Sequence, residues 1–275
     1  MIRHVANQSD GSVDIDDLTL TQKIYLGAIL RAGVKEDFEL IQPIKTFKQI
    51  LAPSSEFEET IFDELYFNRI TTIHPSASMD DFQTDYSKDT FSFTWRNIPL
   101  HINIEGDEGK ENIIKQLLNP PLYEDAFTEE SLEIWNSIIY WECVDLFKYR
   151  METYGFSYKV GKDTKGFFES TIKKLPVSKI YSIIWNAAKN SAAYYQEGNV
   201  SRQQAANSTL SRMRNSLDKV LSGQWSQNDY NRPKDCPQSI ISEYYFNSIL
   251  KICDQGWYRK PALINNDSVM PFPSE

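Results

Sequence analysis

The feature that most constrains this chain is a helical spacing of apolar residues through its second half. Ser201 and Gln204 form a capping-box pattern at the start of the clearest example. The apolar residues that follow recur at intervals of four and three, which places them on one face of a helix: Ala206, Leu210, Met213, Leu217 and Val220. Such a segment is stable only when that face packs against other elements, so the chain is predicted to be a packed, mainly helical protein.

Other helices are predicted from similar spacing and from residues that cap or end a helix. Thr128 caps a long helix and Ser178 caps another, which carries apolar residues on most sides and is expected to be central and buried. The last helix begins at Asp235 and Pro237. The expected ranges are 19–33, 44–51, 56–68, 111–118, 128–154, 178–196 and 235–254.

Short β-branched or alternating runs are confined to the first half of the chain. Residues 70–74, 91–95 and 100–104 are predicted to be strands, because they are β-branched or alternate apolar with polar side chains. Residues 96–99 lie between the last two and are expected to turn a small β-hairpin.

Composition shifts suggest where the chain divides. Residues 105–109 are charged and glycine-rich, as linkers often are. The first 17 residues are polar and acidic, and the residues after Pro261 are polar and contain proline. We therefore expect four parts: a flexible leader (1–17), a first domain (18–106), a helical domain (110–260) and a tail (261–275).

Residues 19–104 resemble a winged helix-turn-helix domain. The expected order is helix, helix, turn, helix, strand, strand, with Leu51-Ala52-Pro53-Ser54-Ser55 as the turn and the strands as the wing. The rest of the chain resembles helical regions of uncharacterised bacterial proteins. The predicted fold class is therefore mainly α, with a winged-helix-like N-terminal unit followed by a larger all-helical domain. The resemblance implies DNA binding through the helix after the turn.

The residues of that helix favour a different partner. The helix contains no Lys or Arg, and carboxylates would be repelled by the phosphates that line the major groove. Its acidic side chains are instead candidates for docking on a basic protein, the alternative being a solvated surface. These residues are Glu56, Glu58, Glu59, Asp63 and Glu64.

Basic residues concentrate later in the sequence. Residues 1–130 carry a net charge of −13, whereas residues 131–275 carry +4. The basic helices could face phosphates, although a solvated helix face is again the alternative. The candidate nucleic-acid-binding residues are Lys179, Lys189, Arg202, Arg212, Arg214 and Lys219.

The sequence carries no recognisable catalytic or cofactor motif. His4, His74 and His101 lack a second ligand at metal spacing, and Cys143 has acidic neighbours that disfavour a thiolate. The three unpaired cysteines favour a reducing, cytoplasmic compartment. The longest apolar stretches fall far short of the length that spans a membrane. We therefore expect no cofactor, no metal and no membrane contact.

Three functions follow, in this order. The first is a non-catalytic, bacterial interaction protein that binds a protein partner through the acidic first domain. The second is a DNA-binding regulator that uses the basic helices. The third is an enzyme whose site is unrecognised, for which a pocket holding Glu142, a Tyr and a Lys would be evidence; a structural ion pair of Glu142 is the alternative. The oligomeric state and the partner stay open.

Overall fold

The protein is mainly helical, as the sequence predicts. The computed structural model describes residues 2–4, 11–85, 90–121, 128–226 and 228–263. Its contacts divide the chain into two units. Unit 1 comprises residues 1–131 and 239–251, and unit 2 comprises residues 132–238 and 252–275. This division differs from the expected one at residues 106–110, because the segment 110–131 and the segment 239–251 both pack within unit 1.

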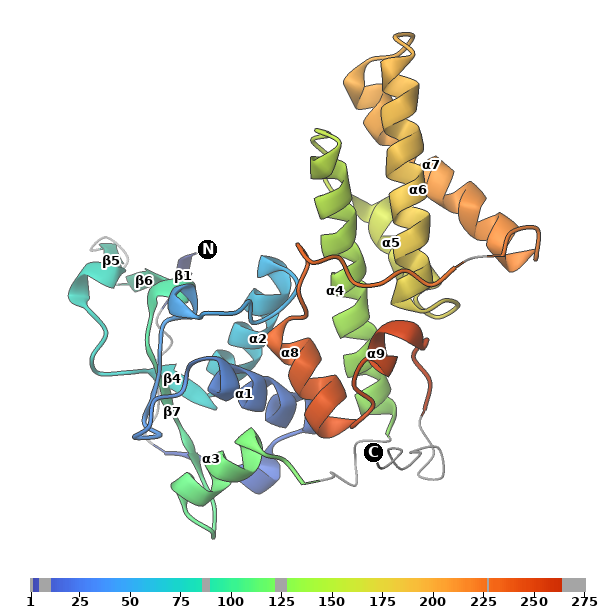
Figure 1. The fold of residues 1–275 in the computed structure, drawn as a ribbon. Helices are drawn as coiled ribbons and strands as arrows, with labels where there is room; N and C mark the ends of the chain where they lie inside the picture. Colours follow the sequence, from blue (N-terminus) through green and yellow to red (C-terminus); the bar gives the residue numbers. More distant parts are fainter. Residues whose placement is uncertain (1, 5–10, 86–89, 122–127, 227, 264–275) are drawn as a thin grey trace. The chain divides into compact units, whose positions relative to one another are not determined.

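Unit 1 is built around α1 (Leu20–Gly33), which packs against the other helices of the unit (Figure 1). Thr19 and Gln22 form a capping box at its start, and most of its side chains are buried. A 3₁₀ turn replaces the helix expected at 44–51 and covers only Ile44–Thr46. The other helices of unit 1 are α2 (Ser55–Phe67), α3 (Lys110–Leu118) and α8 (Ile240–Glu243), which continues as the π-helical turn η6 (Tyr244–Ile249).

The prediction of a last helix over 235–254 was wrong in its extent. Two buried tyrosine hydroxyls hold this part of the chain in unit 1. Tyr244 donates to the carbonyl oxygen of Leu117 at 2.5 Å, and Tyr245 donates to that of Ser131 at 2.5 Å. Burial of these large rings explains why the segment joins unit 1 although the sequence around it belongs to unit 2.

Short strands form three small sheets in unit 1. One has the order β1-β6-β5, the second has the order β3-β7-β4, and the third pairs β2 with β8 in parallel. The strands are β1 (Ile2–His4), β2 (Val13–Asp14), β3 (Leu40–Ile41), β4 (Thr71–Ile73), β5 (Phe82–Asp85), β6 (Thr90–Thr94), β7 (Leu100–Ile102) and β8 (Ile104–Glu105).

The hairpin expected between residues 91–95 and 100–104 does not form. A 3₁₀ turn, Trp95–Asn97, follows β6 and buries the Trp95 indole. As a result β6 pairs with β5 and β1, whereas β7 pairs with β3 and β4. Burial of one large ring thus outweighs the local turn chemistry of residues 96–99.

Part of the expected flexible leader is ordered. β1 pairs antiparallel with β6, with Ile2 opposite Thr94, and β2 pairs with β8. Ile15–Asp17 forms a 3₁₀ turn that the Asp14 side chain caps. Residue 1 and residues 5–10 lie outside the described residues, as does the tail from residue 264.

Unit 2 contains the long helices that the sequence predicts. In it, α7 turns back and crosses α6, and the Thr209 hydroxyl donates to the Ser191 hydroxyl at 2.9 Å where they pack (Figure 1). None of the helices in the described part combines the length and apolar character that a membrane crossing requires. The helices are α4 (Glu129–Thr153, which starts in unit 1), α5 (Lys162–Thr171), α6 (Val177–Gln196), α7 (Arg202–Leu221) and α9 (Gln255–Tyr258).

Two of the three predicted caps are confirmed. Ser201 and Gln204 form the capping box of α7, and the Thr128 hydroxyl accepts from the backbone N–H of Ser131. The third is wrong: α6 follows Pro176, and the Ser178 side chain is buried and donates to the Asp229 carboxylate at 2.6 Å. Proline before the first turn leaves the serine inside the helix, where it serves a tertiary contact instead.

Candidate functional site

The acidic candidates on α2 do not form one exposed face. Glu58 is buried, with 4% of its surface exposed, and its Oε2 lies 2.7 Å from Nη1 of Arg96. Burial raises the pKa of Glu58, while Arg96 and backbone N–H groups of Leu51 and Ala52 oppose that rise. This carboxylate is therefore part of the structure of unit 1, and cannot serve the docking surface that the sequence suggested.

The other four acidic candidates lie on one side of α2, within about 140° of one another, and Glu58 lies on the opposite side. Glu56 is exposed, whereas Glu59, Asp63 and Glu64 are half-buried. Glu64 accepts hydrogen bonds from Gln22 Nε2 at 2.8 Å and from Asn68 Nδ2 at 3.0 Å. Glu64, which was expected to contact a protein partner, therefore already accepts hydrogen bonds within unit 1.

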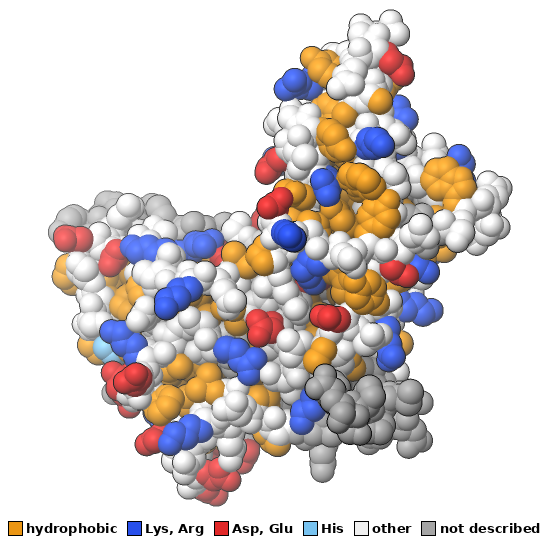
Figure 2. Space-filling model, in the orientation of Figure 1, with side chains coloured by type: hydrophobic (Ala, Val, Ile, Leu, Met, Phe, Trp, Pro, Cys, Tyr) orange, Lys and Arg blue, Asp and Glu red, His pale blue; other side chains and the backbone are white. Residues whose placement is uncertain are grey.

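The basic candidates on α6 and α7 behave differently. None of the six forms an ion pair with a carboxylate in the described part of the chain. Figure 2 shows Lys and Arg side chains interleaved with hydrophobic ones over these helices. Their positive charge therefore remains available to solvent or to an anionic ligand.

Four of the six basic candidates lie over aromatic rings. Such a cation–π contact orients the cation and leaves its outer donors available. The distances from the charged atom to the ring centroid are 5.9 Å for Lys189 and Trp185, 5.2 Å for Arg202 and Tyr195, 5.3 Å for Arg212 and Tyr194, and 4.7 Å for Lys219 and Trp225.

Arg214 does not share this arrangement. It is two residues from Arg212, which corresponds to about 200° around a helix, so the two point to opposite flanks of α7. Arg214 lines a separate cavity together with Lys162, Asp163 and Lys165. The structure therefore does not bring all six candidates onto one surface.

An aromatic cavity in unit 2 is the site that the sequence did not reveal. It has a volume of about 530 Å³ and is centred on Arg150 of α4. The Arg150 guanidinium carbon lies 5.0 Å from the ring centroid of Tyr149, 5.3 Å from that of Tyr181 and 5.8 Å from that of Trp185. Helix spacing of four residues places Tyr181 and Trp185 on the same side of α6.

The other wall of the Arg150 cavity is the segment 229–235, which hydrogen bonds hold in place. Ser178 binds Asp229, as described above, and the Trp257 indole N–H donates to the Tyr230 carbonyl oxygen at 2.7 Å. The Tyr230 ring packs against Trp185, with 5.2 Å between ring centroids. The segment is therefore fixed at several points although it has no regular secondary structure.

The formal charges that line the Arg150 cavity balance, because Arg150 and Lys234 are cations and Asp229 and Asp235 are anions. Its two carboxylates already accept from hydroxyls, Asp229 from Ser178 and Asp235 from Tyr149 at 2.7 Å. Arg150 donates to the Tyr181 hydroxyl at 2.9 Å, and neither Arg150 nor Lys234 has an ion pair with any described carboxylate. The cavity therefore offers two cations without a direct ion pair beside aromatic rings, which are the groups that bind a phosphate and an aromatic ligand.

The buried carboxylate of Glu142 has the structural partner that the sequence allowed as one alternative. Arg232 Nη2 lies 2.9 Å from Glu142 Oε1, and the guanidinium also lies 4.3 Å from the Trp257 ring centroid. Glu142 does not line the Arg150 cavity, although Tyr and Lys side chains do. The combination that would favour an enzyme is therefore incomplete.

Within the described ranges, no three or more His, Cys, Asp or Glu side chains are grouped as a metal site would require. Cys143 is fully buried, and burial holds the pKa of its thiol well above the usual range, which agrees with the predicted core position. Burial also raises the pKa of Cys236 to about 12. The His74 and His101 rings lie 6.1 Å apart, and the His101 ring is within 3.5 Å of a Glu39 oxygen.

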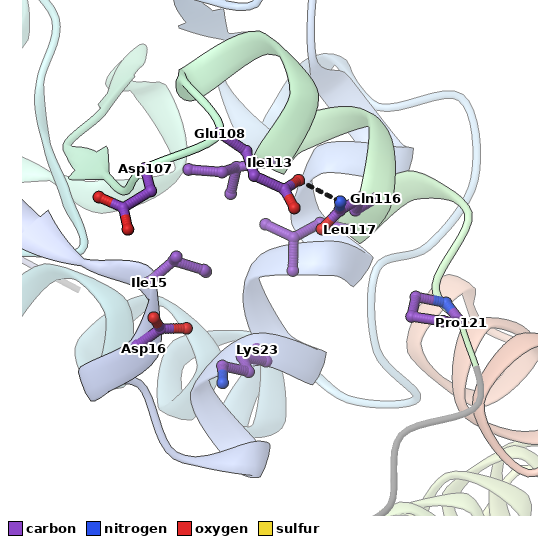
Figure 3. Close-up of a pocket in the computed structure, with 9 residues that line it drawn as sticks. All are labelled: Ile15, Asp16, Lys23, Asp107, Glu108, Ile113, Gln116, Leu117 and Pro121. Atoms are coloured by element: carbon purple, nitrogen blue, oxygen red, sulfur yellow. Dashed lines mark hydrogen bonds between the residues drawn. The ribbon is translucent and has the colours of Figure 1, made fainter.

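A second cavity, of about 350 Å³, lies in unit 1 (Figure 3). Figure 3 shows Asp16 and Asp107 on either side of Ile15, with the Lys23 amine near Asp16 and the Glu108 carboxylate bonded to Gln116. The floor is apolar, formed by Ile113 and Leu117. This cavity combines an acidic rim with an apolar base.

Residue spacing in the sequence could have predicted the part of the Arg150 cavity that the helices form. Tyr181 and Trp185 are four residues apart, and Tyr149 and Arg150 are adjacent on the long helix. The segment 229–235 could not be predicted in this way, because a loop without periodicity carries no information about the helix it will cover.

No family model, no curated protein and no solved structure matches the chain. Its function is therefore inferred from the residues and their geometry.

Proposed function

We propose that unit 2 binds nucleic acid through the basic–aromatic surface of α6 and α7. The basic–aromatic surface is the set of Lys179, Lys189, Arg202, Arg212 and Lys219 together with Trp185, Tyr194, Tyr195 and Trp225. It extends around α6, because Trp185 and Tyr194 are nine residues apart, which corresponds to about 180° around a helix. The observation that carries the proposal is that these cations lack carboxylate partners among the described residues while four of them lie over aromatic rings. Phosphates bind such cations, and bases stack on such rings.

The charge balance of the units supports this assignment. By sequence, unit 2 has 17 basic and 13 acidic residues, a net charge of +4, whereas unit 1 has 12 basic and 25 acidic residues, a net charge of −13. A net charge of −9 for the whole chain argues against coating nucleic acid over the entire surface. Binding is therefore expected to be local to unit 2.

The proposal is tested with the full chain and a labelled 20-nucleotide single strand. Fluorescence anisotropy is followed at about 50 mM and 200 mM salt. If four phosphates are contacted, affinity falls by roughly fiftyfold between the two conditions, because counterions are released from the strand on binding. Absence of binding at the lower salt concentration, where electrostatic attraction is strongest, would contradict the proposal.

A second candidate is docking of a protein partner on unit 1, the leading expectation from the sequence. The cavity of Figure 3 favours it, because an apolar base and the rim formed by Asp16, Asp107 and Glu108 suit a lysine side chain, whose stem is apolar and whose tip is charged. The winged-helix likeness of residues 19–104 and the absence of catalysis likewise remain predictions.

The docking candidate is tested with a tri-lysine peptide, titrated against the full chain and against Asp16→Asn/Asp107→Asn. Binding that the double variant weakens at least fivefold would support it. Equal binding to both proteins would mean that the peptide meets only the general negative charge of unit 1.

A further inference from the structure

The Arg150 cavity has the composition of a site for one nucleotide. We infer that it accepts a single unpaired nucleotide of a bound strand, with the base against Trp185 and Tyr230 and the phosphate on Arg150 and Lys234. This inference rests on the proposed function and adds to it a preference for single strands over duplexes.

The rings supply the surface for a base. Trp185 and Tyr230 are half-buried, so each keeps part of its ring accessible, and their centroids are 5.2 Å apart with the rings tilted at 58°. Two rings tilted in this way do not stack face to face, so part of each ring face is left for a ligand. A planar base can therefore lie on one ring and meet the edge of the other.

The cations supply the phosphate contact. Arg150 is half-buried and its Nε and Nη2 both donate to the Tyr181 hydroxyl, so the guanidinium is held in one orientation. No carboxylate of the described residues forms an ion pair with it or with the exposed Lys234; the Asp229 and Asp235 carboxylates that line the same cavity are held by the hydroxyls of Ser178 and Tyr149. A guanidinium that is partly withdrawn from water and fixed in position binds a phosphate oxygen more strongly than a mobile surface cation does.

The volume and surroundings of the cavity fit this ligand. At about 530 Å³ it falls within the range of roughly 300–1,000 Å³ that small-molecule sites occupy. Lys189 of the basic–aromatic surface lies over the same Trp185 ring as Arg150 does. A strand that follows the surface can thus pass directly from Lys189 to the cavity.

Geometry makes the site selective for unpaired bases. In a duplex both faces of each base are stacked on neighbours, and the base must leave the helix before it can contact a protein ring. A single strand requires no such step. The basic–aromatic surface alone would bind either form through phosphates.

The test compares Trp185→Ala with the natural chain, using a single strand that contains 2-aminopurine and the matching duplex. We expect the variant to lose about tenfold in affinity for the single strand and less than twofold for the duplex. Quenching of 2-aminopurine fluorescence, which reports stacking, is expected with the natural chain and with Trp185→Phe. Trp141→Ala is the matched control, because Trp141 is a half-buried tryptophan of unit 2 outside the cavity.

Arg150→Gln and Arg150→Lys test the phosphate contact independently of the rings. The first is expected to weaken single-strand binding about tenfold and the second less, since lysine keeps the charge. Circular dichroism and thermal melting check that each variant is folded; if Trp185→Ala is not, Trp185→Phe and the Arg150 pair decide the question.

The outcomes separate the two proposals. Equal loss for strand and duplex, or no loss for either, would overturn the cavity inference while nucleic-acid binding stands. Failure of every oligonucleotide to bind the natural chain would remove the proposed function itself. Adenosine monophosphate is titrated as a further probe. If it binds as tightly as the single strand, the ligand of the cavity is a free nucleotide, and the inference of a strand-bound nucleotide is overturned.

Discussion

At the scale of single residues, Glu58 and Arg150 show two ways of compensating a charge that is partly withdrawn from water. Such a charge requires a partner. Glu58 has one within unit 1, the guanidinium of Arg96 at 2.7 Å. Arg150 has three aromatic rings and one hydroxyl, none of which carries a negative charge. Glu58 therefore has its counter-charge within the protein, whereas Arg150 would be stabilised by an anion from outside it.

Arg96→Ala is expected to lower the free energy of unfolding by about 1–2 kcal/mol, because it leaves the buried Glu58 carboxylate without its cation. This expected loss is smaller than for a fully buried ion pair, because 40% of the Arg96 side chain is exposed. Lys115→Ala is the control: it removes an exposed ion pair with Glu111 and should change stability by less than about 0.5 kcal/mol. Urea unfolding measures both, and equal effects would contradict this account of Glu58.

Asp145 is expected to make stability depend on pH. Burial raises its pKa from 3.8 to about 6, so the folded state keeps a proton that the unfolded state releases first. Between about pH 4 and pH 6 the folded chain binds more protons, and this group's contribution to stability falls as pH rises. Asp145→Asn should flatten that dependence and raise the free energy of unfolding at pH 7 by roughly 1–2 kcal/mol, allowing for solvent screening. Urea unfolding of both proteins from pH 4 to pH 7 measures this. A difference in the free energy of unfolding that does not change with pH would contradict the role given to Asp145.

The burial of a single residue could be predicted from the sequence where it depends on the helix that carries the residue. Glu142 lies four residues after Ile138 in one helix, and both are buried, so the structural ion pair that the sequence allowed follows from the need of a buried carboxylate for a partner. The five carboxylates of α2 were instead treated as one group. Glu58 differs from them because it lies three and four residues before the buried Ile61 and Phe62, on the inward face of α2. Its partner Arg96 comes from a distant turn, which no local pattern records.

At the scale of elements, the long helices were predictable and the sheets were not. α4, α6 and α7 carry many turns of periodic sequence and their ends have capping residues or proline. The strands have two to five residues, and their partners lie far away in the chain: β1 pairs with β6, and β3 pairs with β7. Pairing of such short segments is decided by tertiary burial, as at Trp95.

Gly27 lies at a close approach between α1 and the π-helical turn. A Cβ at this position would lie 2.7 Å from Cε1 of Tyr244, whose ring is fully buried and whose hydroxyl is bonded to Leu117. Gly27→Ala is therefore expected to destabilise the protein by about 1–3 kcal/mol despite the better helix propensity of alanine.

Gly166→Ala is the matched control for that substitution. Gly166 is exposed within α5, and apart from its chain neighbours and the backbone of its own helix no described atom lies within 4 Å of the position that an alanine Cβ would occupy there. The change should therefore stabilise the protein by about 0.5–1 kcal/mol. Chemical denaturation compares the two variants, and the same sign of effect for both would contradict the packing proposed around Gly27.

At the scale of the whole molecule, the chain leaves unit 1 after residue 131, returns at residue 239 and leaves again after residue 251. A linker-based division could not predict this course, because composition shifts mark flexible segments and the return is made by a buried, aromatic segment. The charge asymmetry, in contrast, could be read from the sequence. It persists when charges are counted by unit, at −13 and +4.

A chain that ends at Gln238 is expected to lose the packed state of unit 1. It lacks Tyr244, Tyr245 and Phe246, which are fully buried there. Amide hydrogen exchange should show α1 exchanging several orders of magnitude faster than in a chain that ends at residue 263, because α1 packs against α8. Protection of α1 that is unchanged by the truncation would contradict the assignment of this segment to unit 1.

The central claim, that unit 2 binds nucleic acid through α6 and α7, is tested most directly by changing charge on one surface at a time. The salt dependence of single-strand affinity is measured for the natural chain, for Arg212→Gln/Lys219→Gln and for Lys45→Gln/Lys48→Gln. The last pair removes the same charge from exposed positions of unit 1. We predict that the slope of log affinity against log salt becomes shallower by about 1.4 for the unit 2 variant and stays unchanged for the unit 1 variant. Equal slopes for the two variants would contradict the claim.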